Sequence, residues 1–179
     1  MSAETLSREN KVLLIGMMGA GKTTVGEVLA SRLGYPFFDS DEDVMRVTGR
    51  TVTEIFDIEG EESFRSVESE VLLSRLSDTD PAVISVAGGA VLDPHNASLV
   101  SLAGTVVWLR AKLDTLVVRI GDASSRPLLR SGPREVLARL SMVRNPLYES
   151  LANVIVDVDE LQATQIADLI IEKLGVIPC

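Results

Sequence analysis

The residues with the clearest chemical potential form a glycine-rich turn at positions 16–23. They read Gly-Met-Met-Gly-Ala-Gly-Lys-Thr and match the pattern G-x-x-x-x-G-K-[ST] at every position. Glycines let the backbone turn tightly and approach a phosphate, so that successive N–H groups can face the anion. Lys22 then supplies positive charge for the β- and γ-phosphates, and the Thr23 hydroxyl suits Mg²⁺. The pattern therefore predicts a nucleotide site.

The segments on either side of this turn are the ones that phosphate binding requires. Residues 11–15 (KVLLI) are a short apolar run typical of a buried strand, and residues 23–33 carry apolar side chains at helical spacing. A helix that begins at the turn adds the positive end of its dipole to the phosphate site. A chance glycine-rich turn would rarely have both flanks. The residues expected to contact the nucleotide here are Gly16, Met17, Met18, Gly19, Ala20, Gly21, Lys22, Thr23 and Thr24.

Two carboxylates, Asp39 and Asp41, follow the next apolar stretch at residues 36–38. Open α/β sheets bind ligands at the carboxyl ends of their strands, so these carboxylates are placed to serve a site there. Either one is a candidate partner of a metal ion. Asp41 has the alternative role of capping the helix that follows it.

Ser85 stands at the end of a strand where many nucleotide-hydrolysing proteins carry a metal-binding aspartate. The strand is predicted at residues 82–86 (AVISV). This serine either holds a metal-bound water or is a buried hydroxyl with a protein partner. The sequence leaves both interpretations open.

A switch-type GTPase is a competing interpretation, because residues 57–60 spell D-x-x-G. That segment follows a capping box at residues 51–54 and a helical pattern, and it does not follow a strand. The chain also has no N-K-x-D sequence with which to recognise guanine. Both observations favour a kinase over a nucleotide switch.

The elements that must position these residues alternate along the chain. Strand-like apolar runs are followed by segments with helical spacing, which favours a parallel sheet covered by helices on both faces. We expect a three-layer α/β/α fold with a central five-stranded parallel sheet, in one domain over residues 1–179. Strands are predicted at residues 11–15, 36–38, 82–86, 105–109 and 153–156, and helices at 23–33, 61–76, 113–120, 134–151 (with a bend or break at Pro146) and 160–174.

Two further segments are expected to act on the substrates. Residues 40–76 are helical and charged, and they are predicted to form a substrate-binding helical segment. Residues 122–133 are rich in Ser, Gly, Pro and Arg and include Arg126 and Arg130. This composition suits a lid that closes over phosphates and excludes water. An ordinary surface loop is the alternative.

Composition narrows the classes of function. The net charge of −9 argues against non-specific binding of nucleic acid, which needs a basic surface. No run of about 18 apolar residues is present to span a membrane. The first ten residues lack the apolar core of a signal peptide, and Cys179 is the only cysteine, so no intramolecular disulfide can form. We expect a cytoplasmic protein.

Six short motifs together are specific where the glycine-rich turn alone is common. In chain order they are the turn at 16–23, FDSD at 38–41, GEESFR at 60–65, AGGAV at 87–91, RPLL at 126–129 and RNPLY at 144–148. In this order and spacing the chain resembles the shikimate kinase family over nearly its whole length. The resemblance implies a monomer that transfers phosphate from ATP, with Mg²⁺, to the 3-hydroxyl of shikimate in aromatic amino-acid biosynthesis.

The resemblance also implies roles on the acceptor side. Asp41 resembles the catalytic residue that binds the reacting hydroxyl, and Arg65 and Arg144 resemble the pair that holds the substrate carboxylate. Gly88 and Gly89 resemble the backbone wall beside the substrate. A guanidinium fork can hold a carboxylate through two parallel hydrogen bonds, which agrees with these roles.

On the nucleotide side, Arg126 resembles a catalytic lid residue that reaches the phosphates together with Lys22. Arg119 resembles a contact of adenine, and Asp39 resembles an outer-sphere partner of Mg²⁺. Catalysis would then rest on charge neutralisation and positioning, as phosphoryl transfer requires.

Two segments depart from the family pattern. Ala87 replaces the first of three glycines, which is tolerable if its φ is negative. Residues 157–162 bear little likeness to the adenine-side loop of the family, so purine contacts there stay unassigned. Related kinases that act on gluconate or on a nucleoside monophosphate are the alternative interpretation, and only the family likeness of Arg65 and Arg144 separates them from the first.

Overall fold

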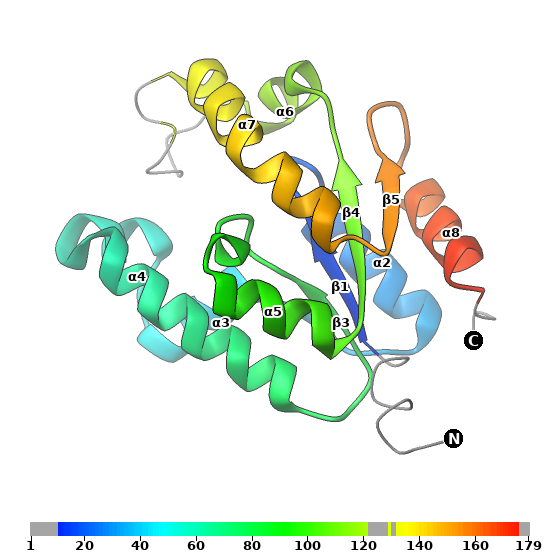
Figure 1. Cartoon of the computed structure of the whole chain (residues 1–179), viewed down its shortest axis with the longest axis horizontal. Coiled ribbons are helices and arrows are strands. Elements are labelled where there is room, and N and C mark those ends of the chain that lie inside the picture. Colours follow the sequence, from blue (N-terminus) through cyan, green and yellow to red (C-terminus); the bar gives the residue numbers. More distant parts are fainter. Residues whose placement is uncertain (1–10, 122–128, 130–131, 176–179) are drawn as a thin grey trace.

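A five-stranded parallel sheet forms the centre of the computed structural model, which describes residues 11–121, 129 and 132–175 (Figure 1). The strand order is β2-β3-β1-β4-β5. The three-layer α/β architecture and the parallel sheet predicted from the sequence are confirmed. The strands are β1 (Lys11–Ile15), β2 (Phe37–Asp39), β3 (Ala82–Ser85), β4 (Thr105–Arg110) and β5 (Val154–Asp157).

Helices cover both faces of the sheet. α2 and α8 pack against each other on one face, and α5 and α7 lie against β4 on the other (Figure 1). α3 and α4 pack together beyond the β2 edge. The helices are α2 (Lys22–Leu33), α3 (Ser40–Thr48), α4 (Val52–Ser77), the 3₁₀ turn η1 (Ala90–Leu92), α5 (Pro94–Ala103), α6 (Leu113–Ile120), α7 (Pro133–Leu151) and α8 (Ala163–Leu174).

The central strand β1 is buried along its whole length, which explains why four apolar residues follow Lys11 without a break. It pairs with β3 on one side and with β4 on the other, so that Leu13 lies opposite both Ile84 and Val106. The chain thus extends the sheet from β1 in both directions. In such sheets ligands bind at the carboxyl ends of the strands where the direction of extension changes. This places the expected site just beyond Ile15, at the glycine-rich turn.

Two helices differ from their predicted form. α4 begins at Val52, directly after the capping box of Thr51, and continues to Ser77 through a kink at Gly60, where φ is 88°. The capping box at 51–54 predicted this start, and the helical spacing at 61–76 predicted the part after the kink. The kink, which the positive φ of Gly60 produces, was not predicted. A bend or break was predicted at Pro146, and no break occurs, because α7 continues from Pro133 to Leu151. The turn beyond Pro146 still forms, and the N–H of Ala152 donates to the carbonyl oxygen of Tyr148 at 3.0 Å.

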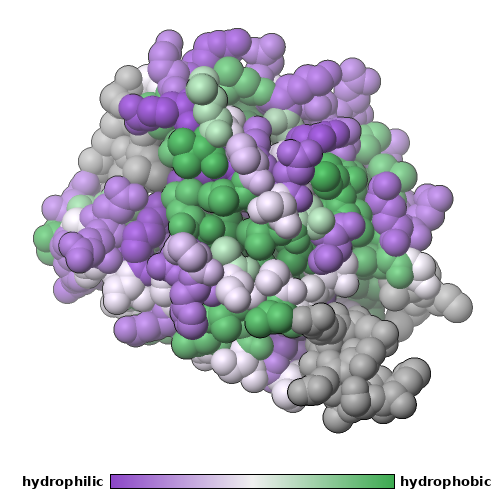
Figure 2. Space-filling model, in the orientation of Figure 1, coloured by the Kyte–Doolittle hydropathy of each residue, from purple (hydrophilic) through white to green (hydrophobic). Residues whose placement is uncertain are grey.

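Hydrophilic and apolar residues share the face of the molecule seen in Figure 2. Figure 2 shows hydrophilic residues around the rim of the face seen in Figure 1, with apolar residues gathered nearer its middle. Met142 and Val143 on α7 belong to the exposed apolar surface. Arg144, the next residue, is only 2% exposed, so its charged side chain is buried. In the described ranges no helix is long and apolar enough to cross a membrane.

Candidate active site

The phosphate turn, residues 16–23, lies between β1 and α2 as predicted. Gly16 has a φ of +145°, and a Cβ there would lie 2.7 Å from the carbonyl oxygen of Leu109, so only glycine fits. Gly21 caps α2 with a φ of 94°. The Lys22 amine donates to the carbonyl oxygens of Gly16 at 2.9 Å and Met17 at 3.3 Å, and so lies over the turn. The turn joins a helix amino terminus to a close cation, which suits a polyphosphate.

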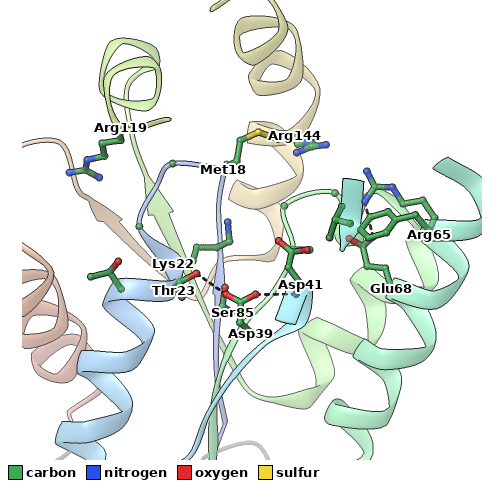
Figure 3. Close-up of a pocket in the computed structure, with 18 of the residues that line it drawn as sticks. Met18, Lys22, Thr23, Asp39, Asp41, Arg65, Glu68, Ser85, Arg119 and Arg144 are labelled. Atoms are coloured by element: carbon green, nitrogen blue, oxygen red, sulfur yellow. Dashed lines mark hydrogen bonds and ion pairs between the residues drawn. The ribbon is translucent and has the colours of Figure 1, made fainter. Parts of the chain in front are cut away.

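A pocket of about 540 Å³ opens beside this turn at the carboxyl edge of the sheet (Figure 3). It brings together most of the predicted site residues, which come from the turn after β1, from α2, β2, α3, α4, α6 and α7, and from the segment after β3. Those that line it are Met18, Gly19, Gly21, Lys22, Thr23, Thr24, Asp39, Asp41, Arg65, Gly88, Gly89, Arg119 and Arg144. Gly16, Met17 and Ala20 do not line the pocket and form the inner part of the turn. Arg126 and most of the predicted lid at 122–133 lie outside the described residues.

Asp39 joins the phosphate turn to Asp41. One carboxylate oxygen of Asp39 accepts a hydrogen bond from the Thr23 hydroxyl at 2.7 Å, and the other accepts from the backbone N–H of Asp41 at 3.0 Å (Figure 3). Asp39 is therefore the residue that caps α3, and the alternative capping role considered for Asp41 is wrong. This arrangement leaves Asp41 in the first turn of α3, with its side chain at the pocket.

Ser85 lies directly beside Asp39 in the sheet, because β2 and β3 pair these two residues. It lines the pocket although it is only 2% exposed. Its position suits either a metal-bound water or a buried hydroxyl, so the two interpretations stay open.

Arg65 from α4 and Arg144 from α7 meet across two glycines, with both guanidinium groups against their backbone. We call residues 87–90 the glycine loop. A Cβ on Gly88 would lie 3.3 Å from Nη1 of Arg144, and a Cβ on Gly89 would lie 2.6 Å from Nη1 of Arg65. Because Gly88 and Gly89 have no side chains, the two guanidinium groups fit against the glycine loop and line the same pocket.

Glu68 is a site residue that the sequence reasoning missed. It lines the pocket, is 1% exposed and accepts a hydrogen bond from Arg65 at 2.7 Å. Burial raises the pKa of its carboxyl group, and the neighbouring Arg65 opposes that rise. Burial would also lower the pKa of Arg65, but the carboxylates of Glu68 and Glu61 outweigh it and keep the guanidinium charged. The spacing of one helical turn between Arg65 and Glu68 was the available signal.

Two buried polar atoms at this place have no hydrogen-bond partner among the described residues. They are Oε1 of Glu68 and Nε of Arg144. Buried polar atoms without partners are rare in folded proteins, because each costs free energy. An acceptor and a donor of this kind suit a polar ligand or an ordered water between α4 and α7.

Three apolar side chains of α4 also line the pocket, and none of them was predicted as a site residue. Val52 and Phe56 come from the part of α4 before the kink, and Phe64 comes from the part after it. The rings of Phe56 and Phe64 are 4.8 Å apart, and the guanidinium carbon of Arg65 lies 5.1 Å from the Phe64 ring. Apolar side chains together with several charged groups suit a small anion with a hydrocarbon skeleton.

Arg119 stands at the other end of the pocket, between the phosphate turn and the loop after β5. Its guanidinium donates to the carbonyl oxygens of Val158 at 2.6 Å and Ala20 at 3.4 Å. Asp159 in the same loop accepts from the N–H of Lys112 at 2.8 Å and so ties the loop to the start of α6. The segment at 157–162 that had no assigned role thus holds Arg119 beside the phosphate turn.

Ala87, which replaces a family glycine, is accommodated without strain. No non-glycine residue in the part of the chain that the structure describes has a positive φ. The N–H of Ala87 donates to the Ser40 hydroxyl at 2.8 Å, which anchors the start of the glycine loop to α3.

Comparisons with known proteins agree with this geometry. The chain matches the family model described as Shikimate kinase over residues 18–175. A shikimate kinase from Tolumonas auensis is 41% identical over 172 residues, or 95% of this chain and 99% of that protein. The solved structure of a shikimate kinase from Acinetobacter baumannii in complex with shikimate is similar with a TM-score of 0.91 and 34% identity, over 97% of each chain. A gluconokinase from Sinorhizobium meliloti shares the fold, with a TM-score of 0.64 and 21% identity. The chain belongs to the shikimate kinase family of ATP-dependent small-molecule kinases.

Proposed function

We propose that this chain transfers the γ-phosphate of ATP to the 3-hydroxyl of shikimate, which gives shikimate 3-phosphate and ADP in aromatic amino-acid biosynthesis. The observation that carries the proposal is the pair Arg65 and Arg144, which flank the glycine loop in the pocket that the phosphate turn also lines. A carboxylate held there would fix the orientation of a small ring relative to the phosphates. Membership of the family supplies the identity of the acid.

The phosphate turn and Lys22 would hold the β- and γ-phosphates. Arg126 would add a second positive charge on the transferring group. Phosphoryl transfer depends mostly on such positioning and charge neutralisation, so these residues are the proposed source of most of the rate. Arg119 would lie against the adenine, where the loop after β5 holds it.

Thr23 and Asp39 would hold Mg²⁺. Their side-chain oxygens are 2.7 Å apart and are the hard donors that this ion prefers. No cluster of three or more His, Cys, Asp or Glu residues in the described ranges forms a metal cage. Mg²⁺ is commonly bound with its nucleotide through one or two protein ligands, which this donor set provides. The bound ion supplies positive charge against the phosphate oxygens.

Asp41 would orient the reacting hydroxyl and accept its proton late in the reaction. Its place in the first turn of α3 is fixed by the hydrogen bond from its N–H to Asp39. Arg65 and Arg144 would hold the carboxylate, while Gly88 and Gly89 form the wall beside the ring.

The chain is proposed to be one domain, with residues 40–76 as its substrate-binding segment and residues 122–133 as a lid that excludes water. A cytoplasmic location and a monomeric state stay predictions from the sequence.

An assay of ADP release with a panel of acceptors tests the proposal. Shikimate, gluconate, AMP and no acceptor are compared at saturating MgATP. We expect turnover with shikimate and background rates in the other three. Turnover with gluconate or AMP instead would move the chain to another acceptor class, and ATP binding without any acceptor-dependent turnover would refute a kinase of these substrates.

A further inference from the structure

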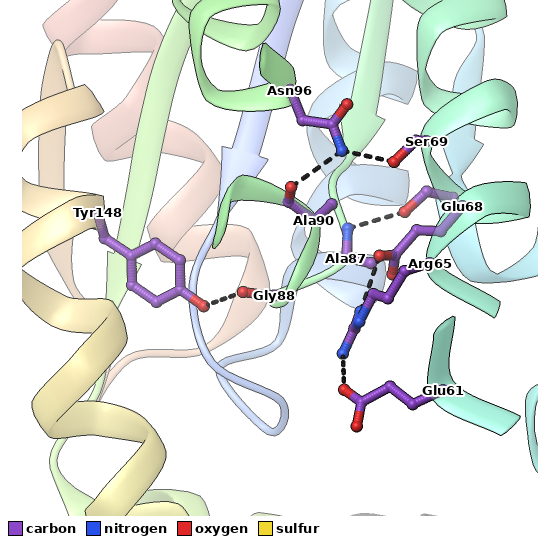
Figure 4. Close-up of polar contacts among 10 residues, drawn as sticks. Glu61, Arg65, Glu68, Ser69, Ala87, Gly88, Ala90, Asn96 and Tyr148 are labelled. Carbon is purple, nitrogen blue, oxygen red and sulfur yellow. Dashed lines mark hydrogen bonds and ion pairs between the residues drawn. The ribbon is translucent and has the colours of Figure 1, made fainter. Parts of the chain in front are cut away.

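The helix that carries Arg144 is bonded to the glycine loop one turn beyond that arginine. Tyr148 follows Arg144 on α7, and its hydroxyl donates to the carbonyl oxygen of Gly88 at 2.7 Å (Figure 4). The Tyr148 side chain is fully buried beside Trp108, with ring centroids 5.9 Å apart. Burial raises the pKa of Tyr148 to about 12, so its hydroxyl stays a donor at neutral pH.

The helix that carries Arg65 is bonded to the same loop through one more residue. Ser69 stands one turn beyond Arg65 on α4, and its hydroxyl accepts a hydrogen bond from Nδ2 of Asn96 at 2.8 Å. The same nitrogen donates to the carbonyl oxygen of Ala90 at 3.1 Å (Figure 4). Asn96 is 3% exposed, so water competes little with this bridge. α4 and α7 are thus both bonded to the glycine loop.

The loop between these bonds separates the two guanidinium groups. The Tyr148 hydroxyl and Nη1 of Arg144 would lie 3.0 Å and 3.3 Å from a Cβ on Gly88. The guanidinium of Arg65 lies closer still to Gly89, with Nη1 2.6 Å from the position of a Cβ there. A displacement of the loop therefore moves the two positive groups relative to each other. Bidentate recognition of a carboxylate tolerates little such displacement.

We propose that Tyr148, and the pair of Asn96 and Ser69, are positioning residues that set the separation of Arg144 and Arg65 across the acceptor site. None of these three residues lines the pocket. Their effect on acceptor binding must therefore pass through the glycine loop and the arginines. The inference rests on the proposed function, because it assumes that the arginines hold the acceptor.

Two substitutions that each delete one oxygen atom test this inference: Tyr148→Phe and Ser69→Ala. Tyr35→Phe and Ser74→Ala make the same chemical changes outside the pocket, and Ser74 is exposed on the same helix as Ser69. The KM for shikimate, the KM for ATP, kcat and the midpoint of thermal unfolding are measured for the full-length variants.

We expect Tyr148→Phe to raise the KM for shikimate about fivefold, which corresponds to the loss of one net hydrogen bond. Ser69→Ala should raise it about twofold, because Asn96 keeps its bond to Ala90. The KM for ATP should stay within about twofold, and both controls should match the parent protein. A lower unfolding midpoint with no rise in the KM for shikimate, or an equal rise in both KM values, would show a merely structural role and overturn the inference.

A double-mutant cycle gives a second readout. Because Tyr148 is proposed to act through Arg144, Tyr148→Phe should change the KM for shikimate by less than about 1.5-fold in the Arg144→Ala background. An undiminished fivefold effect in that background would overturn the inference. A parent protein that does not turn over shikimate would refute the proposed function and this inference with it. Turnover by the parent with unaffected variants would refute this inference alone.

Discussion

The two ends of the pocket are built from different materials. At the nucleotide end, the site is formed by the backbone of contiguous residues: residues 16–23 form the turn, and glycines with positive φ let it approach a ligand. At the acceptor end, single side chains from α3, α4 and α7 meet around the glycine loop. A turn made of backbone changes little when a side chain is shortened, whereas a pocket made of side chains depends on how separate helices pack.

This difference decides how each half responds to change. A backbone site fails when a new side chain forces the chain out of its conformation, and this costs folding free energy as well as binding. A side-chain site can lose an interaction while the fold is kept, and the defect is then confined to one substrate. The predictions below use this contrast, from the largest expected effect to the smallest.

Asp41→Asn should remove chemistry and leave the nucleotide half intact. We expect kcat to fall about 1,000-fold, since a positioned general base contributes about 10²–10⁴ in rate. The Kd for ATP, measured by calorimetry, should stay within about twofold of the parent value. Near-normal turnover of this variant would refute the role given to Asp41.

Gly16→Ala should disrupt the phosphate turn, which is the half of the pocket formed by backbone. The new Cβ would meet the carbonyl oxygen of Leu109 at 2.7 Å, and alanine rarely adopts a φ of +145°. We expect the free energy of unfolding in urea to fall by about 3 kcal/mol, together with weaker ATP binding. A variant with parent-like stability and ATP affinity would contradict the view that this turn depends on backbone conformation.

Arg144→Ala should weaken acceptor binding in the half of the pocket formed by side chains. Loss of a charged hydrogen-bonding group should raise the KM for shikimate about 30-fold, while the Kd for ATP is largely kept. Steady-state kinetics at saturating MgATP measure the first quantity and calorimetry the second. An unchanged KM for shikimate would remove the proposed carboxylate clamp.

Asp43→Asn should lower stability in a way that depends on pH. Asp43 is buried, and it accepts hydrogen bonds from Nε and Nη2 of Arg75 at 2.6 and 2.9 Å. Burial raises the pKa of Asp43, but the bonds and charge of Arg75 outweigh it and lower that pKa overall. The carboxylate therefore stabilises the fold above its unfolded pKa of about 3.9, and this contribution is lost as pH falls through the lower folded value.

For Asp43→Asn we expect a free energy of unfolding about 2 kcal/mol lower at pH 7. The difference from the parent protein should shrink as the pH falls below about 3.9. Urea unfolding at a series of pH values measures both. A difference that does not depend on pH would show that charge is not the cause.

Gly89→Ala is the matched counterpart of Gly16→Ala. Gly89 has a φ of −92° and a ψ of −16°, which alanine can adopt, so the backbone conformation should be kept. The new Cβ would instead displace the guanidinium of Arg65, and we expect the KM for shikimate to rise about fivefold with stability unchanged. A loss of stability as large as that of Gly16→Ala would contradict the view that changes in the side-chain half affect binding and leave the fold intact.

The same contrast explains how much the sequence could predict. The strands were predicted to within one or two residues, because buried parallel strands are continuous apolar runs. The phosphate turn was predicted residue by residue, because its parts are adjacent in the chain. On the acceptor side, family likeness pointed to Arg65 and Arg144, but pattern alone did not. Glu68 was missed although its spacing of one helical turn from Arg65 was a signal, and Asn96 was missed because only the packing of α4 and α5 brings it to the glycine loop.

The carboxylate of Asp39 does not belong to one half alone. One of its oxygens serves the hydroxyl proposed to hold the metal, and the other fixes the backbone of the proposed base. We therefore expect the binding of MgATP and the position of Asp41 to be coupled through this single side chain, and by reciprocity we expect each substrate to change the affinity for the other. Substitution of Asp39 should therefore impair the use of both ATP and the acceptor, whereas substitutions within either half should mainly affect one of the two substrates.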